Sequence, residues 1–224
     1  MPTRRPRRRT VLLAAAGVLA ALAVAAGVLA LGASRGWFDS GSVEGTSAGF
    51  EAGEAPRPAP AAGAWREYGF DARRTHANTG LDLPPPYRRL WRHDAGSLLE
   101  FPPVIANGRV VVGTNAGLAL ALDARTGREL WRAPLRGRVA ASPALTGGLA
   151  LFSTIRGDVV ALRAATGEEV WRRRVGSAVE SSPLVVDGDV YVGTLNGGVL
   201  RLDARSGGVR WRARTEGDVK ASLA

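Results

Sequence analysis

Short runs of alternating apolar and polar residues, separated by glycine-containing turns, fill the second half of the chain. Between residues 139 and 173 this alternation predicts four short strands. They cover residues 139–145, 149–154, 159–162 and 169–173. Turns such as Gly147-Gly148 and Arg156-Gly157 separate them, as in tight β-hairpins. No helical period appears in this stretch, so we expect an all-β fold.

The four-strand pattern recurs at a constant interval along the chain. Tryptophans at 91, 131, 171 and 211 mark this interval, and each is followed by arginine. The stretches 101–132, 141–172 and 181–212 align with one another without a gap. A fixed period of about 40 residues with only strand signals is typical of propeller blades, which must stack on neighbours to bury both faces. We therefore predict a β-propeller of four-stranded blades, with about three blades present.

One eleven-residue motif, "ALDARTGRELW" from 121 to 131, defines each blade. We expect small Ala121 to allow close packing of the third strand, and Asp123 to accept N–H bonds across the next turn. Gly127 supplies a positive φ, and the Trp131 ring lies between adjacent blades. The other copies of this structural docking motif are Ala161, Gly167, Trp171, Asp203, Gly207 and Trp211, with Trp91 ahead of the first full blade. The middle copy has Arg163 in place of aspartate, which weakens its turn.

The motif Ala-x-Asp-x-x-Thr-Gly-x-x-x-Trp resembles the tryptophan-docking motif of the pyrroloquinoline-quinone-like (PQQ-binding-like) β-propeller repeat family. The lead-in "WREYGFDARRTHANTG", from 65 to 80, also resembles the segment that often precedes the first blade. The resemblance implies either a scaffold, like the barrel-assembly lipoprotein of outer membranes, or a quinone-dependent dehydrogenase. The dehydrogenases need a calcium-binding Glu/Asn/Asp set, a catalytic aspartate and often a vicinal disulfide. The chain has no cysteine, and no residue can be matched to the other ligands, although the blades we expect to be missing could hold some of them. We therefore predict no cofactor; PQQ and calcium belong only to the dehydrogenase alternative.

The N-terminal third predicts export and tethering. Residues 1–10 form a basic cytoplasmic segment, and the uncharged apolar run 11–33 is long enough to cross a bilayer as a helix. This run is read as a transmembrane signal anchor, with a cleaved signal peptide as the alternative. Residues 34–64 form a Gly/Ala/Pro-rich linker predicted to be disordered. We expect a single-pass membrane protein whose propeller lies outside the cytoplasm, in the periplasm or at the cell surface.

The blades are too few for a closed ring of four to eight. Residues 65–96 are predicted to be a lead-in and a ring-closing strand around Trp91, and residues 97–224 to hold the blades. The last residues, "GDVKASLA", read as the start of another first strand. We therefore expect a truncated propeller that lacks about four or five blades. A three-blade chain that closes its ring by oligomerising is the alternative.

Charge and candidate chemistry favour binding over catalysis. The net charge is +10, but five arginines fall in the first nine residues, so we expect no nucleic-acid partner. The two histidines, His76 and His93, have no recognisable triad partner. Equivalent positions of successive repeats, Glu100, Ala140, Glu180 and Lys220, are candidates for one mouth of the central channel. We expect a non-catalytic scaffold for a protein or cell-envelope component; alternatives are a dehydrogenase fragment or a sensor domain of an envelope system.

Overall fold

The computed structural model describes residues 63–224, which fall within one compact unit, Arg57–Ala224. The predicted membrane segment and all but the end of the predicted linker lie outside the described residues. Among residues 63–224, no helix is long and apolar enough to cross a membrane.

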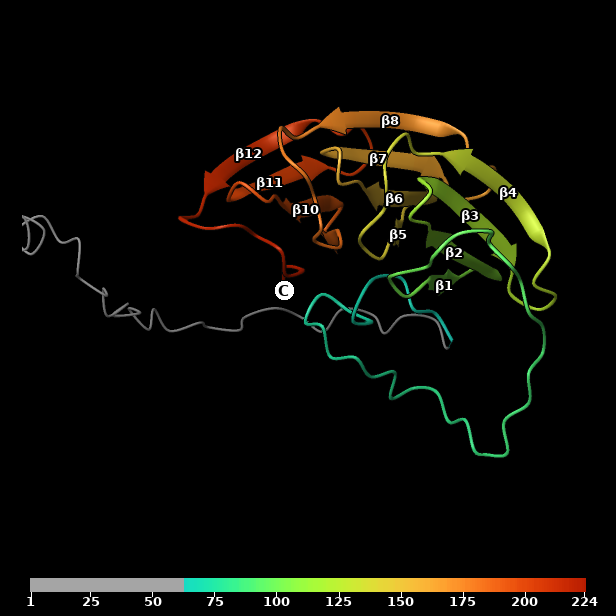
Figure 1. The fold of residues 1–224 in the computed structure, drawn as a ribbon. Helices are drawn as coiled ribbons and strands as arrows, with labels where there is room; N and C mark the ends of the chain where they lie inside the picture. Colours follow the sequence, from blue (N-terminus) through green and yellow to red (C-terminus); the bar gives the residue numbers. More distant parts are fainter. Residues whose placement is uncertain (1–62) are drawn as a thin grey trace, which may run out of the picture. The chain divides into compact units, whose positions relative to one another are not determined.

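Three four-stranded antiparallel sheets make up the fold, each formed by strands in consecutive order (Figure 1). This confirms the predicted all-β blades. The first sheet holds β1 (Val104–Ala106), β2 (Arg109–Gly113), β3 (Leu118–Asp123) and β4 (Glu129–Pro134). The second holds β5 (Ala144–Thr146), β6 (Leu149–Ser153), β7 (Asp158–Arg163) and β8 (Glu169–Arg174). The third holds β9 (Leu184–Val186), β10 (Asp189–Gly193), β11 (Gly198–Asp203) and β12 (Val209–Arg214).

The middle strands of the first two sheets are buried on both faces. The apolar runs of β2 and β3 have burial patterns in which consecutive residues are buried, whereas β4 alternates buried and exposed positions. One apolar cluster joins the first sheet to the second, and both Trp131 and Phe152 belong to it. A second cluster joins the second sheet to the third, around Leu151 and Leu202. The sheets therefore bury each other's faces in chain order.

The first strand of the second blade is shorter than predicted. The pattern predicted a strand over 139–145, but β5 spans Ala144–Thr146. The residues before it make contacts with neighbouring blades instead: the Val139 N–H donates to the Thr114 carbonyl, and the Ser142 hydroxyl donates to the Pro102 carbonyl. Pro143 lacks an N–H for a ladder. Alternation alone does not distinguish this crossing segment from a strand.

Two end segments follow the path of the repeat without forming strands among the described residues. Residues 89–94, which align with β4, have no strand assignment. Residues 217–224 have none either, but the Ser182 N–H donates to Ser222 Oγ at 3.0 Å, as the Ser142 N–H donates to Ser182 Oγ at 3.1 Å. Residues 217–224 thus contact the third blade in the same way that the segment before β9 contacts the second blade.

Candidate functional site

The constant spacing of the tryptophans places each indole on the next blade. Trp131 Nε1 donates to the Ala164 carbonyl at 3.0 Å, and Trp171 Nε1 to the Ala204 carbonyl at 2.9 Å. Trp91 makes the same bond to the Ala124 carbonyl at 3.0 Å, although its own segment forms no strand. The ring of each tryptophan covers the turn glycine of the following motif copy, at Gly127, Gly167 and Gly207. Trp211 has no such partner among residues 63–224, and its side chain is 39% exposed.

The alanines of the motif leave room for these rings. Ala121 lies directly across the β3–β4 ladder from Trp131, and Ala161 across the β7–β8 ladder from Trp171. Both alanines are fully buried. In the third blade Arg201 takes this place opposite Trp211. Each ladder has a bulge at the following residue, so the register irregularity is itself part of the repeat.

The aspartates of the motif organise the turn before the tryptophan. Asp123 Oδ1 accepts from the N–H groups of Arg125 and Thr126 and from the Thr126 hydroxyl, all within 3.0 Å. These hydrogen bonds, above all the hydroxyl of Thr126, lower the pKa of Asp123 from its ordinary value. Asp203 makes the equivalent set with Ser206. Arg163 cannot, and its turn rests on main-chain bonds to its carbonyl and an ion pair with Glu168 at 3.4 Å.

The predicted channel-mouth residues are not brought together by any contact in the structure. Glu100 forms an ion pair with Arg138 at 3.6 Å. Ala140 is buried, Glu180 is half-buried, and Lys220 is exposed. The mouth therefore remains a sequence prediction.

A feature that the sequence did not predict is the position of the lead-in segment, residues 65–80, along the inner strands. The Ile105 N–H donates to the Trp65 carbonyl at 2.7 Å, and the reverse bond is also 2.7 Å. The Leu145 N–H donates to the Arg66 carbonyl at 2.7 Å, and the Val185 N–H to Glu67 Oε2 at 3.3 Å. Ile105, Leu145 and Val185 lie in β1, β5 and β9, at equivalent positions of successive repeats. Three consecutive lead-in residues thus bond the inner strand of three consecutive blades.

A buried ion pair holds the far end of the lead-in segment. Arg74 Nη1 lies 3.4 Å from Glu67 Oε2, and the two side chains are 9% and 12% exposed. Arg74 Nε also donates to the Leu223 carbonyl at 2.9 Å, and Nη1 donates to the Tyr68 carbonyl. Burial lowers the pKa of Arg74, while the Glu67 carboxylate opposes this effect. No periodic signal marks Glu67 or Arg74, since they precede the repeats; only their charge on a short aromatic-rich segment could have pointed to them.

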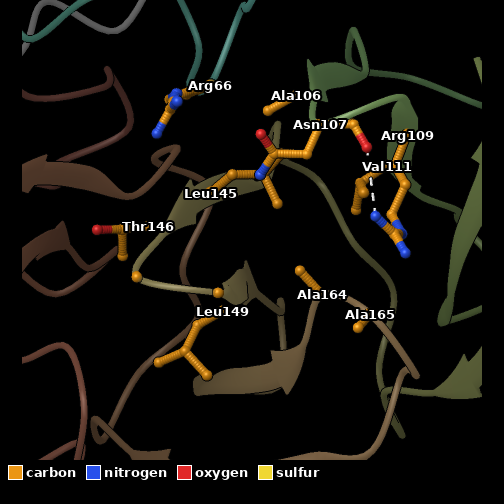
Figure 2. Close-up of a pocket in the computed structure, with 12 residues that line it drawn as sticks. Arg66, Ala106, Asn107, Arg109, Val111, Leu145, Thr146, Leu149, Ala164 and Ala165 are labelled. Carbon is orange, nitrogen blue, oxygen red and sulfur yellow. Dashed lines mark hydrogen bonds between the residues drawn. The ribbon is translucent and has the colours of Figure 1, made fainter.

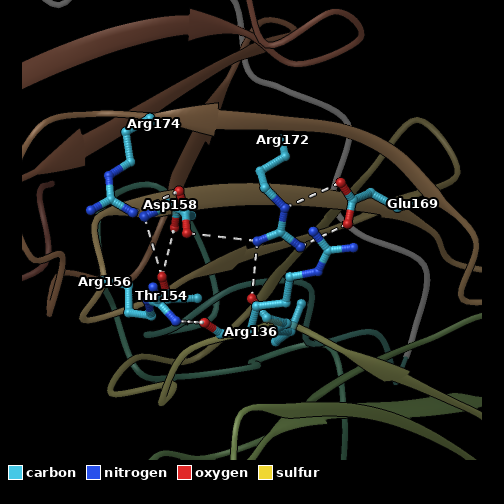
Figure 3. A network of polar contacts seen from close by, with 8 residues as sticks. Arg136, Thr154, Arg156, Asp158, Glu169, Arg172 and Arg174 are labelled. Atoms are coloured by element: carbon cyan, nitrogen blue, oxygen red, sulfur yellow. Dashed lines mark hydrogen bonds and ion pairs between the residues drawn. The ribbon is translucent and has the colours of Figure 1, made fainter.

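A second polar network links the first two sheets at their outer strands (Figure 3). Arg172 donates to Glu169 in a bidentate pair at 3.2 and 2.7 Å, and to the Leu135 carbonyl at 2.9 Å. The hydrogen bond from Arg172 lowers the pKa of Glu169. Asp158 lies between Arg172 and Arg174, at 3.8 and 3.4 Å. Every carboxylate of this network is paired with arginine, which is typical of a structural role.

Two pockets lie on equivalent sites between the sheets. The first has a volume of about 150 Å³ and is formed by the β1–β2, β5–β6 and β7–β8 turns together with Arg66 (Figure 2). The second, of about 380 Å³, is formed by the β5–β6, β9–β10 and β11–β12 turns. Within residues 63–224, no group of three or more His, Asp or Glu side chains could hold a metal ion.

The comparison with protein families decides the family. Residues 85–154 and 141–224, together more than half of the chain, match the family described as "Outer membrane protein assembly factor BamB". The chain belongs to the pyrroloquinoline-quinone-like β-propeller repeat family. The resemblance read from the tryptophan motif is therefore confirmed. No curated protein sequence matches the chain.

Solved structures of other proteins share the fold. BamB from Moraxella catarrhalis is 27% identical, with a TM-score of 0.51; the match covers 55% of this chain and 40% of that one. Quinohemoprotein alcohol dehydrogenase from Comamonas testosteroni is 24% identical, with a TM-score of 0.54 and coverage of 68% and 27%. A europium-containing methanol dehydrogenase is 23% identical, with a TM-score of 0.53 and coverage of 58% and 27%. The chain thus spans less than half of each of these proteins, and the two dehydrogenases inform the fold alone.

Proposed function

We propose that this chain is a non-catalytic scaffold, held at the membrane by residues 11–33, whose blades bind a protein or envelope component outside the cytoplasm. The family model that matches the chain is described as an outer membrane protein assembly factor, and the BamB structure from Moraxella catarrhalis is similar to the chain. Both support a role in recognition. Export of the blades, as the sequence of residues 1–33 predicts, would bring them to such a partner and supports the proposal.

The observation that carries the proposal is the path of the lead-in segment. Propellers enclose a channel bounded by their inner strands, and a ligand of that channel must lie against those strands. Here the N–H groups of Ile105, Leu145 and Val185 are already bonded by three successive lead-in residues. A planar cofactor at this level would have to displace a segment that is fixed by the buried pair of Glu67 and Arg74. Recognition through the turns and blade interfaces requires no such displacement.

Addition of pyrroloquinoline quinone and calcium to the full chain tests the proposal. A ligand that binds only the folded state raises the melting temperature with its concentration. We expect no shift, and no quinone-dependent reduction of a dye with alcohols as substrates. A quinone dehydrogenase purified without its cofactor provides the positive control. A saturable rise in melting temperature, accompanied by dye reduction, would contradict the scaffold and favour the dehydrogenase.

A further inference from the structure

The pocket between the first and second sheets has the chemistry of an anion site. Arg66 and Arg109 both line it, and no aspartate or glutamate does. Neither arginine forms an ion pair with a carboxylate anywhere in residues 63–224. Figure 2 shows the two side chains on opposite sides of the pocket, with Leu145 between them and Ala164 below. Two cations without counter-ions therefore line one small space.

Arg109 has unused hydrogen-bonding capacity. Its Nη1 donates to the Asn107 carbonyl at 3.2 Å, which fixes the guanidinium beside the β1–β2 turn. Its Nε is buried and has no hydrogen-bond partner among the described residues. That atom is enclosed by the protein, so the donor open to a ligand is the Nη2 group, which makes no hydrogen bond with the described residues; such an N–H group is well satisfied by an oxyanion. Arg109 is thus held in place by one bond while other donors remain available.

The basic character does not follow from the repeat. The equivalent pocket, one repeat further on, has Leu149 where the first has Arg109. It also contains the carboxylates of Asp187 and Asp203, and Arg66 does not line it. The second pocket is also lined by two arginines, but Arg210 pairs with Asp189 and Asp203. The geometry of the turns is therefore shared, whereas two arginines without a carboxylate partner line the first pocket.

The rest of the lining selects the kind of anion. Val111, Leu145, Leu149 and Ala164 give the pocket an apolar wall beside the guanidinium groups. A phosphate has no apolar part to place there, whereas the last residue of a polypeptide carries a carboxylate next to its side chain. The planar carboxylate also matches the fork of an arginine. The volume of about 150 Å³ suits one small residue rather than a longer segment.

We propose that this pocket binds the C-terminal carboxylate of a partner polypeptide that ends in a small apolar residue. The proposal rests on the scaffold function and names the group by which a partner is recognised. Arg109 donates to the carboxylate, Arg66 adds positive charge from the opposite side of the pocket, and the apolar wall accepts the last side chain. The turn glycines Gly147 and Gly148 leave the pocket open, since neither has a neighbouring atom within 4 Å of its Cβ direction.

Calorimetric titration of the full chain with the peptide acetyl-Gly-Ala-Val tests the site. The same peptide with a C-terminal amide serves as the ligand control. R109L introduces the residue that the next repeat has at this position, and R66Q leaves the main-chain bond of Arg66 to Leu145 intact. The matched control is R205A, in the second pocket, where the preceding repeat has Ala165. We expect saturable binding of the acid, about tenfold weaker binding in each of R109L and R66Q, and no change in R205A.

Three results would overturn the proposal. Equal binding of the amide peptide would show that the C-terminal carboxylate is not the group that is recognised. Equal weakening by R205A and R109L would show a general effect of surface charge. Binding of free isobutyrate as tight as that of the peptide would assign the site to a small acid and not to a polypeptide end. The scaffold itself would survive each of these results, because it depends on the separate test with quinone and calcium.

Discussion

Substitution of Gly167 by alanine adds a single carbon atom where the Trp131 ring packs on the turn. Gly167 has φ of +78°, and a Cβ there would lie 2.7 Å from Trp131 Cε3 and 2.8 Å from Cδ2. The left-handed conformation alone costs an L-residue roughly 1–2 kcal/mol. Forcing a methyl group into a packed contact adds roughly 1–3 kcal/mol. Since Trp131 is only 8% exposed and anchored by its bond to the Ala164 carbonyl, the ring cannot move aside freely. We expect G167A to destabilise the chain by about 2–5 kcal/mol.

Gly148 provides a control with the same backbone conformation and no contact. Its φ is +80°, and nothing lies within 4 Å of its Cβ direction. G148A should therefore show the conformational cost alone, about 1–2 kcal/mol. Urea unfolding of both variants, followed by tryptophan fluorescence, gives the difference. If G148A and G167A lowered the unfolding midpoint equally, the close packing of Trp131 on Gly167 would contribute nothing, and our account of the repeat would be refuted.

Three further predictions follow from the buried pair, the turn aspartates and the proposed topology. Glu67→Leu leaves Arg74 buried without its carboxylate partner and should lower the free energy of unfolding, measured in urea, by about 3 kcal/mol. R132Q, at an exposed ion pair, should lower it much less. Equal losses in the two variants would contradict the burial of the Glu67–Arg74 pair. The pKa of Asp123 is lowered in the folded state, so its contribution to folding stability is present above the unfolded pKa and is lost as the pH falls through the folded pKa. D123N should therefore flatten the fall in melting temperature below about pH 4. An unchanged dependence of the melting temperature on acid pH would contradict this. Because the chain lacks cysteine, E216C introduces a single thiol. This thiol should react with a membrane-impermeant maleimide in intact cells once any outer membrane is permeabilised. Reaction only after complete lysis would place the blades in the cytoplasm.

The repeat was predictable because its signals are local and recur. Trp131, Gly167 and the constant spacing of the motif fix which turn each ring must cover, and the structure places the ring there. The first strand of the second blade was predicted too long, because 139–143 is mostly apolar, as a buried strand would be, while its bonds go to other blades. Local pattern therefore gives blade identity more reliably than strand limits.

The lead-in contacts and the basic pocket were not predictable in the same way. Trp65, Arg66 and Glu67 bond residues in three different blades, partly through main-chain groups that carry no sequence signal. The pocket needs three turns from two blades to meet. One clue was present in the sequence. The aligned repeats have Arg109, Leu149 and Asp189 at one position, so the fold does not require a particular side chain there and the position can serve a function.

The central claim, that the chain's own lead-in segment lies along the inner strands, is tested most directly by amide hydrogen exchange. We predict that the N–H groups of Ile105, Leu145 and Val185 are protected as strongly as the ladders of their own sheets. In Glu67→Ala, the Val185 N–H should lose protection, while Leu145, bonded to the Arg66 carbonyl, should keep it. Rapid exchange at all three amides in the unmodified chain, with the ladders still protected, would contradict the claim and leave the inner strands open to a ligand.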